Sequence, residues 1–396
     1  MKILVINCGS SSIKYQLFEI KNNDFVLLAK GLVDRIGESG SGINHKPANA
    51  DSIAIKYDLA DHKAAMELIV STLTHPEHGV ISDLSEINGV GHRVVHGGEE
   101  FSSSVLITED VIKGIVDRYD LAPLHNPPNV TGIQACKALG DIPNVAVFDT
   151  AIHQTIPPKA YMYAIPLEFY KKYGIRKYGF HGTSHGYVSK KAAELLGKPF
   201  EELKIITCHV GNGGSIAAFA DGKCQDTSMG MTPLEGIVMG TRCGDLDPAV
   251  VLYMMRALKM TADEIDNLLN KKSGMLGLTG YSDMRDVNRL AEAGDENAQT
   301  ALDMFCYQIQ KYIGAYVSTI NGVDAIVFTA GVGENDQLVR AKVLENFSYL
   351  GLKIDHDRND KNETILSTDD SKVTAMMIPT NEELVIAQEA YSIIHG

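Results

Sequence analysis

The sequence predicts an α/β protein built from two related halves. Short apolar runs of strand length alternate with amphipathic stretches of helical period, which favours a sheet covered by helices. A strand, a polar Gly/Ser turn and a second strand open the chain. A similar unit recurs 202 positions later, with His209 in the place of Asn7. A unit repeated at about half the length of a 396-residue chain indicates a duplication.

Composition and charge limit the classes of protein to which the chain can belong. Its 396 residues are 44% hydrophobic and 22% charged, as in an ordinary globular protein, and the length favours more than one domain. The net charge of −14 repels nucleic acid and anionic membranes, so neither partner is expected and an anionic ligand needs a local basic site.

Cysteine usage and the apolar runs indicate the compartment. Six cysteines without a CxxC pair are typical of thiols in a reducing environment, which predicts a cytoplasmic protein. The apolar run at residues 3–6 is too short for a signal peptide, and 18 apolar residues never occur together. The sequence thus predicts neither export nor membrane insertion.

The first half is expected to start with a β-hairpin over residues 1–20, because apolar residues alternate on both sides of the turn. The periodicity further predicts strands at 90–95 and 145–148 and helices at 64–73, 109–119 and 129–139.

The second half repeats the hairpin over residues 204–220. In this alignment Gly9 matches Gly211, Ser10 matches Asn212, and Leu17 matches Phe219. A long helix over 298–320 has apolar residues at spacings of three and four, so one of its faces is buried in the domain core or in an interface. The other predicted elements are helices at 248–258 and 262–270, strands at 325–329 and 373–378, and helices from Gln337 and Asn381.

Three glycine-rich turns are candidates for phosphate binding. The turns of the two hairpins offer backbone N–H groups and hydroxyls, and Lys14 follows the first. The third, at residues 329–335, joins a strand to a helix, where ligands approach open α/β sheets. No Walker motif occurs, and a single Gly/Ser cluster is more often an ordinary turn, but the paired occurrence favours a binding role.

Charged residues near these turns suggest chemistry on anions. Arg93 ends a strand and Arg242 lies between glycines, which suits the binding of phosphate or carboxylate, although a surface ion pair is the alternative. His181 and His185 lie at the start of a helix in a pattern that does not fit zinc and better matches phosphoryl stabilisation. Asp149 follows a strand as a candidate catalytic acid or as a cap.

These motifs together resemble the acetate and butyrate kinase family, within the superfamily of actin, sugar kinases and heat-shock ATPases. The matching segments occur in the family's order and without departure: Asn7-Cys8-Gly9-Ser10-Ser11-Ser12-Ile13-Lys14, His92-Arg93-Val94-Val95-His96-Gly97-Gly98, Phe148-Asp149-Thr150-Ala151-Ile152-His153, Tyr178-Gly179-Phe180-His181-Gly182-Thr183-Ser184-His185, Met229-Gly230-Met231-Thr232-Pro233-Leu234-Glu235-Gly236, Gly331-Val332-Gly333-Glu334-Asn335 and Pro379-Thr380-Asn381-Glu382-Glu383.

The resemblance implies duplicated ribonuclease H-like (actin-like ATPase) domains that close on MgATP in an interdomain cleft. We expect an N-terminal domain at residues 1–150, completed by the C-terminal helix near 381–396, and a C-terminal domain at 151–396 that binds nucleotide and forms a homodimer.

The resemblance also assigns roles to single residues. Catalytic roles fall to Asp149, His181, Arg242 and Arg93, and the methyl pocket beside Arg93 to Val95, Leu124, Phe180 and Pro233. Mg²⁺, or Mn²⁺ in its place, would be held by Asn7 and Glu382, with Glu383 as the alternative to Glu382. The ATP or ADP contacts would be Lys14, His209, Val210, Gly211, Asn212, Gly213, Asp283, Met284, Arg285, Gly331, Val332, Gly333, Glu334 and Asn335.

The implied reaction is reversible, Mg²⁺-dependent transfer of the γ-phosphoryl group of ATP to the carboxylate of acetate, which gives acetyl phosphate and ADP. Acetate is already an anion and needs no general base, so Asp149 is expected to orient an arginine or a metal-bound water. Propionate is the nearest alternative substrate, because one methylene changes binding by only about 1 kcal/mol. An actin-like ATPase and a sugar kinase are more remote alternatives.

Overall fold

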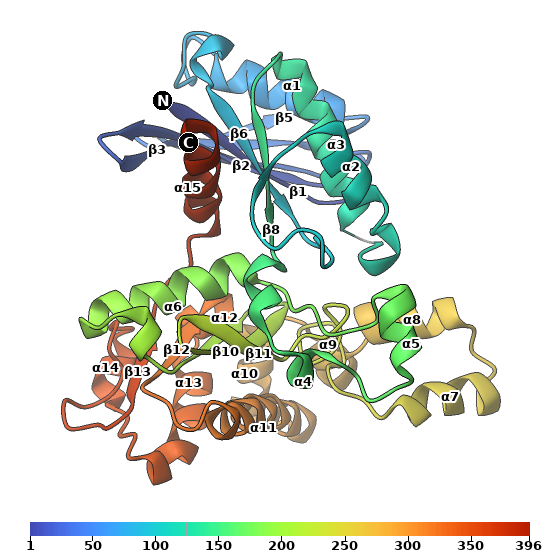
Figure 1. Cartoon of the computed structure of the whole chain (residues 1–396), viewed down its shortest axis with the longest axis vertical. Helices are drawn as coiled ribbons and strands as arrows, with labels where there is room; N and C mark the ends of the chain where they lie inside the picture. The colour runs from blue at the N-terminus through green and yellow to red at the C-terminus, as the bar shows by residue number, and fades with distance from the viewer. Residues whose placement is uncertain (124) are drawn as a thin grey trace. The chain divides into compact units, whose positions relative to one another are not determined.

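The computed structural model describes residues 1–123 and 125–396, which divide into two compact units (Figure 1). Unit 1 comprises Met1–Ala151 and Asn381–Gly396, and unit 2 comprises Ile152–Thr380. Each unit is built around a β-sheet with helices packed on it.

The sheet of unit 1 has the strand order β5-β4-β3-β2-β1-β6-β8-β7. β1 pairs antiparallel with β2 and parallel with β6, and β6 pairs parallel with β8, so the carboxyl ends of β1, β6 and β8 meet at one edge. The strands are β1 (Lys2–Cys8), β2 (Ile13–Lys21), β3 (Asp24–Asp34), β4 (Gly42–Pro47), β5 (Ile53–Lys56), β6 (Gly89–Val94), β7 (Val105–Leu106) and β8 (Asn144–Phe148).

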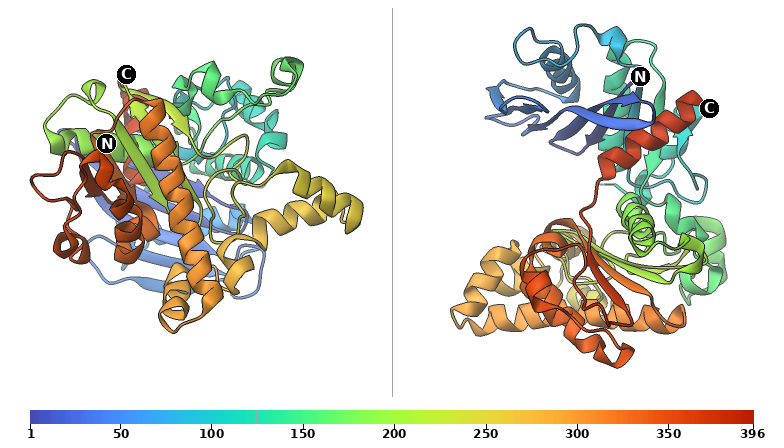
Figure 2. Two further views of the ribbon diagram at one scale, coloured as in Figure 1. Left: turned by 90° about the horizontal axis from the view of Figure 1, so that it is seen from below. Right: turned by 90° about the vertical axis from the view of Figure 1, so that its left-hand side faces the viewer.

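Helices cover both faces of this sheet because its central strand is apolar on both sides. Leu4 and Ile6 of β1 belong to a core cluster that includes residues of α1 (His62–Leu73) and α3 (Asn126–Cys136), whereas Ile3 and Val5 pack with α15 (Glu382–His395). Figure 2 shows α15 beside the N-terminal strands, to which the end of the chain returns. The remaining helix, α2 (Glu109–Val116), packs against α3.

The sheet of unit 2 repeats part of this topology. Its order β11-β10-β9-β12-β13 has the same sequence of antiparallel and parallel pairs as β3-β2-β1-β6-β8 of unit 1. This shared topology is the structural form of the predicted duplication. The strands are β9 (Ile205–Val210), β10 (Gly214–Ala220), β11 (Lys223–Thr227), β12 (Ala325–Thr329) and β13 (Thr374–Met377).

The two hairpin turns differ in length by one residue. Cys8 pairs with Ile13 across the first turn, whereas Val210 pairs with Gly214 across the second. Leu17 lies opposite Leu4, and the corresponding partner of Ile206 is Ala218. The predicted match of Leu17 with Phe219 is therefore wrong by one position, because the second turn is shorter.

Helices α6 (Gly182–Leu196) and α11 (Glu296–Thr319) lie on opposite sides of the unit 2 strands (Figure 1). The buried face of α11 packs within its own unit, since its inward residues are already covered in the single chain: Ala298, Ala301, Leu302, Phe305, Cys306, Ile309, Ile313 and Tyr316. The other helices are α4 (Pro158–Tyr161), α5 (Leu167–Tyr173), α7 (Pro248–Ala257), α8 (Ala262–Lys271), α9 (Gly274–Thr279), α10 (Met284–Glu292), α12 (Ala330–Asn335), α13 (Gln337–Leu344) and α14 (His356–Asp360).

The segment predicted as a glycine turn at residues 329–335 instead forms the short helix α12. Ala330 makes the corner after β12 with a φ of +66°. Glu334 holds this coil, because its Oε1 accepts hydrogen bonds from the N–H groups of Ala330 (2.9 Å) and Thr380 (3.1 Å). Among the helices of the described residues, none combines the length and the apolar character that a membrane crossing requires.

Candidate active site

Arg93 and Asp149 form the centre of the candidate site in unit 1. Arg93 Nη2 lies 2.5 Å from Asp149 Oδ2, and Arg93 Nε donates to Oδ1 at 3.2 Å. The third nitrogen, Nη1, donates to Asn7 Oδ1 at 3.4 Å. A guanidinium that makes such a bidentate contact with a carboxylate has a fixed orientation, as a site for an anionic substrate requires.

Strand topology brings these three residues together. Arg93 lies in β6, Asn7 lies near the end of β1, and Asp149 follows β8, and these strands are parallel neighbours. Asn129 of α3 fastens two of the strand ends, because its Nδ2 donates to the Cys8 carbonyl (2.8 Å) and its Oδ1 accepts from the Val95 N–H (3.0 Å). Parallel strands that end at one edge therefore explain the cluster.

The electrostatics of unit 1 centre on the same arginine. Burial opposes the charge of Arg93, but Asp149 and Glu382 overcome this effect and raise its pKa above the ordinary value. Burial raises the pKa of Glu382 to about 7, and Arg93 only partly opposes this rise while Asp149 adds to it. Glu382 is thus a carboxylate whose negative charge is incompletely balanced by the protein.

The oxygen atoms of Asn7 and Glu382 fit a hard divalent cation. Mg²⁺ prefers oxygen ligands and usually takes one or two from protein carboxylates, with the rest from water and phosphate. In the described part of the chain, no three His, Cys, Asp or Glu residues gather into a closed metal cage. A cation beside Glu382 would balance the charge that burial leaves uncompensated.

Lys14 and Glu383 line a separate hollow of about 260 Å³ on the face of β2, β3 and β4. Lys14 is exposed in β2, next to the turn that the sequence singled out. Both neighbouring acids at the start of α15 raise the pKa of Arg93, Glu382 more than Glu383, and only Glu383 lines this hollow.

In unit 2, His181 occupies the predicted position at the start of α6. It is the N-cap residue in a left-handed conformation (φ 56°, ψ 25°), and its side chain makes no capping hydrogen bond. Its Nδ1 lies 2.9 Å from Ser215 Oγ, and its ring stacks on His209 with centroids 4.1 Å apart. A side chain at position 213 would meet His181 Nε2 at 3.7 Å and Arg242 Nη1 at 3.2 Å, so both nitrogens border Gly213.

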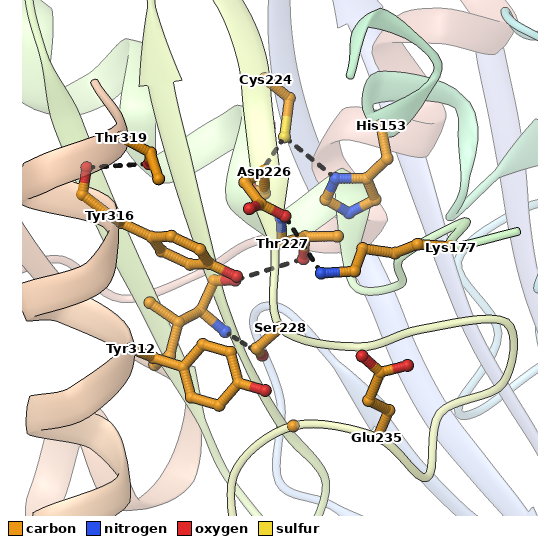
Figure 3. Close-up of polar contacts among 12 residues, drawn as sticks. His153, Lys177, Cys224, Asp226, Thr227, Ser228, Glu235, Tyr312, Tyr316 and Thr319 are labelled. Atoms are coloured by element: carbon orange, nitrogen blue, oxygen red, sulfur yellow. Dashed lines mark hydrogen bonds and ion pairs between the residues drawn. The ribbon is translucent and has the colours of Figure 1, made fainter. Parts of the chain in front are cut away.

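His153 supports the turn that carries His181. Its Nε2 lies 3.0 Å from the Phe180 carbonyl oxygen, and its Nδ1 lies 3.2 Å from Cys224 Sγ (Figure 3). Because a carbonyl only accepts, His153 Nε2 carries a proton and donates to it. The single thiol proton of Cys224 has two acceptors within reach, His153 Nδ1 and the Asp226 carbonyl oxygen (3.4 Å). Burial raises the pKa of the Cys224 thiol, which keeps its proton in place. His153 therefore fixes the residue before His181.

Arg242 is the candidate arginine of unit 2. Its Nη1 donates to the Pro233 carbonyl at 3.2 Å. Burial lowers the pKa of Arg242, and no carboxylate in the described residues acts against this shift. A half-buried guanidinium without a carboxylate in contact among the described residues is prepared for an anionic ligand.

A pocket of about 840 Å³ in unit 2 is lined by most of the residues predicted to contact the nucleotide. Gly211, Asn212, Asp283, Met284, Arg285, Gly331, Val332 and Asn335 line it. Five other residues predicted to contact the nucleotide lie outside this lining: His209, Val210, Gly213, Gly333 and Glu334. Glu334 instead holds the β12–α12 corner.

Several lining residues were not predicted from the sequence. The pocket also includes Gly240, Ser282, Asn288, Glu292, Phe305, Asp336, Gln337 and Leu338. Asn288 donates to Asp336 Oδ2 at 2.7 Å, which joins α10 to the start of α13. Asp283, which the resemblance did name, caps α10, because its carboxylate accepts from the Arg285 N–H. The Arg285 side chain, which donates to both Asp283 oxygens, and then the Arg285 N–H lower the pKa of Asp283 to about 2.

The residues expected to contact a methyl group belong to both units. Val95 is buried in unit 1, whereas Phe180 is buried and Pro233 half-buried in unit 2. Leu124 lies outside the described residues. Within unit 2, Phe180 adjoins His181 and Pro233 contacts Arg242, so each apolar residue accompanies a candidate catalytic one.

Comparisons with known proteins agree in one family. A family model described as the acetokinase family matches residues 2–388. An acetate kinase from Natranaerobius thermophilus is 55% identical over 398 residues, which span 100% of each chain. Among solved structures, acetate kinase from Porphyromonas gingivalis gives a TM-score of 0.94 at 45% identity, with 99% of each chain covered. A propionate kinase from Francisella tularensis gives 0.93 at 43%, also with 99% of each chain covered.

Proposed function

Because this chain belongs to the acetokinase family, we propose that it transfers the γ-phosphoryl group of ATP to the carboxylate of acetate, which gives acetyl phosphate and ADP. The enzyme acts on a substrate that is already negatively charged at neutral pH. Its catalytic residues therefore need to bring two anions together and stabilise the charge on the phosphoryl group, not to remove a proton.

The structural observation that carries the proposal is the pair of arginines held in different ways. Arg93 is oriented by a buried carboxylate, which suits recognition of the planar acetate carboxylate. Arg242 has no carboxylate in contact within the described residues and borders Gly213 beside His181, which suits the phosphoryl oxygens. We assign substrate binding to Arg93 and phosphoryl stabilisation to Arg242 and His181.

Asp149 acts as a positioning residue in this proposal. Both of its oxygens contact Arg93, and the acetate oxygen offers no proton for it to remove. The carboxylate therefore fixes the orientation and the charge of the arginine.

The nucleotide would bind in the unit 2 pocket, which is lined by Gly211 and Asn212 of the second hairpin turn and by Asp283, Met284 and Arg285 at the start of α10. Asn7 and Glu382 would hold Mg²⁺, with Mn²⁺ as a substitute. When bound, the ion would neutralise charge on the phosphate oxygens. Lys14 would add a further positive charge for the same polyanion.

The six cysteines are all free thiols, which supports a reducing compartment, and we propose the cytoplasm. We also propose a homodimer formed through unit 2. On α11, Met304 and Tyr307 remain exposed opposite the buried face, and Leu252 and Tyr253 are exposed on α7. Light scattering of the purified protein measures the mass directly, and a monomer at micromolar concentration would contradict the dimer.

The function is tested by mixing the purified protein with MgATP, hydroxylamine and one of formate, acetate, propionate, butyrate or glycerol. Acyl hydroxamate should form fastest with acetate, accompanied by an equal amount of ADP. Release of ADP with glycerol, or at one rate for every acid, would replace the proposal with a sugar kinase or an ATPase.

Propionate kinase is the second candidate, favoured by the likeness to the Francisella tularensis enzyme. A higher kcat/KM with propionate than with acetate in the same assay would select it. The expected difference is small, because a methylene in an apolar pocket is worth about 1 kcal/mol.

A further inference from the structure

A continuous chain of buried side chains leads from the middle of the unit 2 sheet to His181. Thr207 Oγ1 lies 2.6 Å from His185 Nδ1, His185 Nε2 lies 2.7 Å from Ser215 Oγ, and Ser215 Oγ lies 2.9 Å from His181 Nδ1. Thr207, His185 and Ser215 are fully buried, so they exchange hydrogen bonds with protein groups and not with bulk water.

The number of protons in this chain permits only two arrangements when both rings are neutral. Each hydroxyl has one proton and each neutral imidazole has one N–H, so all three bonds must run in the same direction. If they run toward Thr207, His181 donates from Nδ1 and presents a bare Nε2. If they run toward His181, its Nδ1 accepts and its proton lies on Nε2.

The geometry at Thr207 favours the second direction. Running toward Thr207, the chain would end with the Thr207 hydroxyl donating to the Ala217 carbonyl, which lies 3.5 Å away. Running toward His181, the same hydroxyl donates to His185 Nδ1 at 2.6 Å. The 2.6 Å contact is closer to the usual length of a bond from a hydroxyl donor, about 2.7 Å, than to that of an N–H···O bond, about 2.9 Å, and the Thr207 proton has a close acceptor only in the second direction.

The surroundings oppose a positive charge on both rings. Burial, followed by the nearby His153 and His209, lowers the pKa of His185 well below its ordinary value. His181 stacks on His209 and shares the border of Gly213 with the cationic Arg242. A second positive charge on either ring would be repelled, so His181 can donate a hydrogen bond from Nε2 only as the corresponding neutral tautomer.

We propose that Thr207, His185 and Ser215 are positioning residues that hold neutral His181 in its Nε2–H tautomer, so that the ring donates a hydrogen bond toward the transferring phosphoryl group. The identity of the acceptor rests on the proposed function, but the tautomer is a property of the substrate-free protein. The three residues would thereby supply a fixed donor without adding a second charge beside Arg242.

The tautomer is measured directly by NMR of the full chain labelled with ¹⁵N-histidine, because ¹⁵N shifts distinguish a ring N–H from a bare ring nitrogen. The signals of His181 are assigned by their loss in His181→Asn. We expect a protonated Nε2 and a bare Nδ1 in the wild-type protein at neutral pH. The opposite pattern would overturn the proposal.

Thr207→Val removes the hydroxyl that starts the chain and keeps the side-chain shape. His181 should then populate the Nδ1–H form, and kcat should fall by about 10- to 100-fold with little change in the KM of ATP or acetate. Thr207→Ser should restore both readouts. Thr227→Val is the matched control, because Thr227 is also buried in this sheet but donates only to the Ile216 carbonyl. An unchanged tautomer and kcat in Thr207→Val would contradict the proposal.

The pH profile separates this role from general damage to the fold. An imidazolium carries a proton on Nε2 whichever way the chain runs, so the ratio of wild-type to Thr207→Val kcat should narrow as the pH falls, without the full recovery that repulsion by Arg242 prevents. Among the described residues, the charged and titratable groups that face the chain include Arg242, His209 and His153, all of which are retained in the variant. A uniform loss of activity at every pH would indicate misfolding and count against the proposal. A protein with the expected tautomer but without acyl phosphate formation would refute the proposed function alone.

Discussion

Arg93 and Asp149 share a two-pronged ion pair in which the carboxylate is completely buried and the guanidinium retains partial exposure. This asymmetry matters because the exposed part of Arg93 remains available to a ligand while the buried acid fixes its plane. The pair is thus a means of presenting a cation in one orientation.

Asp149→Asn should keep the shape of this pair and remove its charge. We expect kcat/KM for acetate to fall at least about 100-fold, because Arg93 loses its orienting carboxylate. The free energy of unfolding should fall by about 3 kcal/mol, since one partner of a buried pair is left without its counterion. Steady-state kinetics and urea denaturation measure the two effects. Nearly full turnover in Asp149→Asn would mean that the acid does not position Arg93.

Gly213→Ala tests the closeness of His181 and Arg242. A methyl group at this position would lie 3.2 Å from Arg242 Nη1 and 3.7 Å from His181 Nε2. Small displacements of catalytic groups are costly, so kcat should drop by about 10- to 100-fold. Gly314→Ala is the control, because a methyl group there meets nothing within 4 Å and lies in the middle of α11. Equal activities of the two variants would show that position 213 tolerates a side chain.

Acid should destabilise the protein through His92 of β6. Burial, only partly opposed by the hydrogen bond to Asn144, lowers the pKa of His92 to about 4. The ring is neutral when folded and binds a proton more readily when unfolded. Its contribution to stability is therefore complete above pH 6.5 and is lost as the pH falls toward 4, at a total cost of about 3 kcal/mol.

The measurement is urea denaturation of the wild-type protein and of His92→Gln at pH 7 and pH 5. Glutamine keeps a donor toward Asn144 Oδ1, which lies 2.7 Å from His92 Nε2, but does not titrate. The variant should lose less stability than the wild type between the two pH values. Parallel losses would assign the acid sensitivity to other groups.

Much of this architecture follows from local patterns in the sequence. The hairpins of residues 1–20 and 204–220 and the buried face of α11 were predicted because alternation and helical spacing are properties of short segments. Arg93 and Asp149 could be named as candidates because each lies near the end of a buried strand. Their mutual contact also depends on β6 and β8 being parallel neighbours.

The remaining features depend on contacts between distant segments. Thr207 reads as an ordinary strand residue, and its importance appears only when α6 places His185 against it. Asn129 likewise gains its role from the packing of α3 on β1 and β6. The coiling of residues 330–335 depends on Thr380, which reaches Glu334 from 46 positions away.

Glu382 and Glu383 can be separated as metal ligands by matched amide variants. Glu382→Gln removes the incompletely balanced carboxylate near Arg93 and Asp149, so the Mg²⁺ concentration for half-maximal activity should rise at least about tenfold. Glu383 lines the hollow that Lys14 also lines, and Glu383→Gln should change the Mg²⁺ concentration for half-maximal activity little.

Binding of Mn²⁺ in the presence of ADP, followed by electron paramagnetic resonance, provides a second readout that does not require turnover. The stability of Glu382→Gln gives the internal check. Burial raises the pKa of Glu382 to about 7, so its charge is costly to keep in the folded protein, and a neutral amide should leave Tm unchanged or higher. A weakened metal response together with an intact Tm would assign the ligand to Glu382. The same response in Glu383→Gln alone would transfer the assignment to its neighbour.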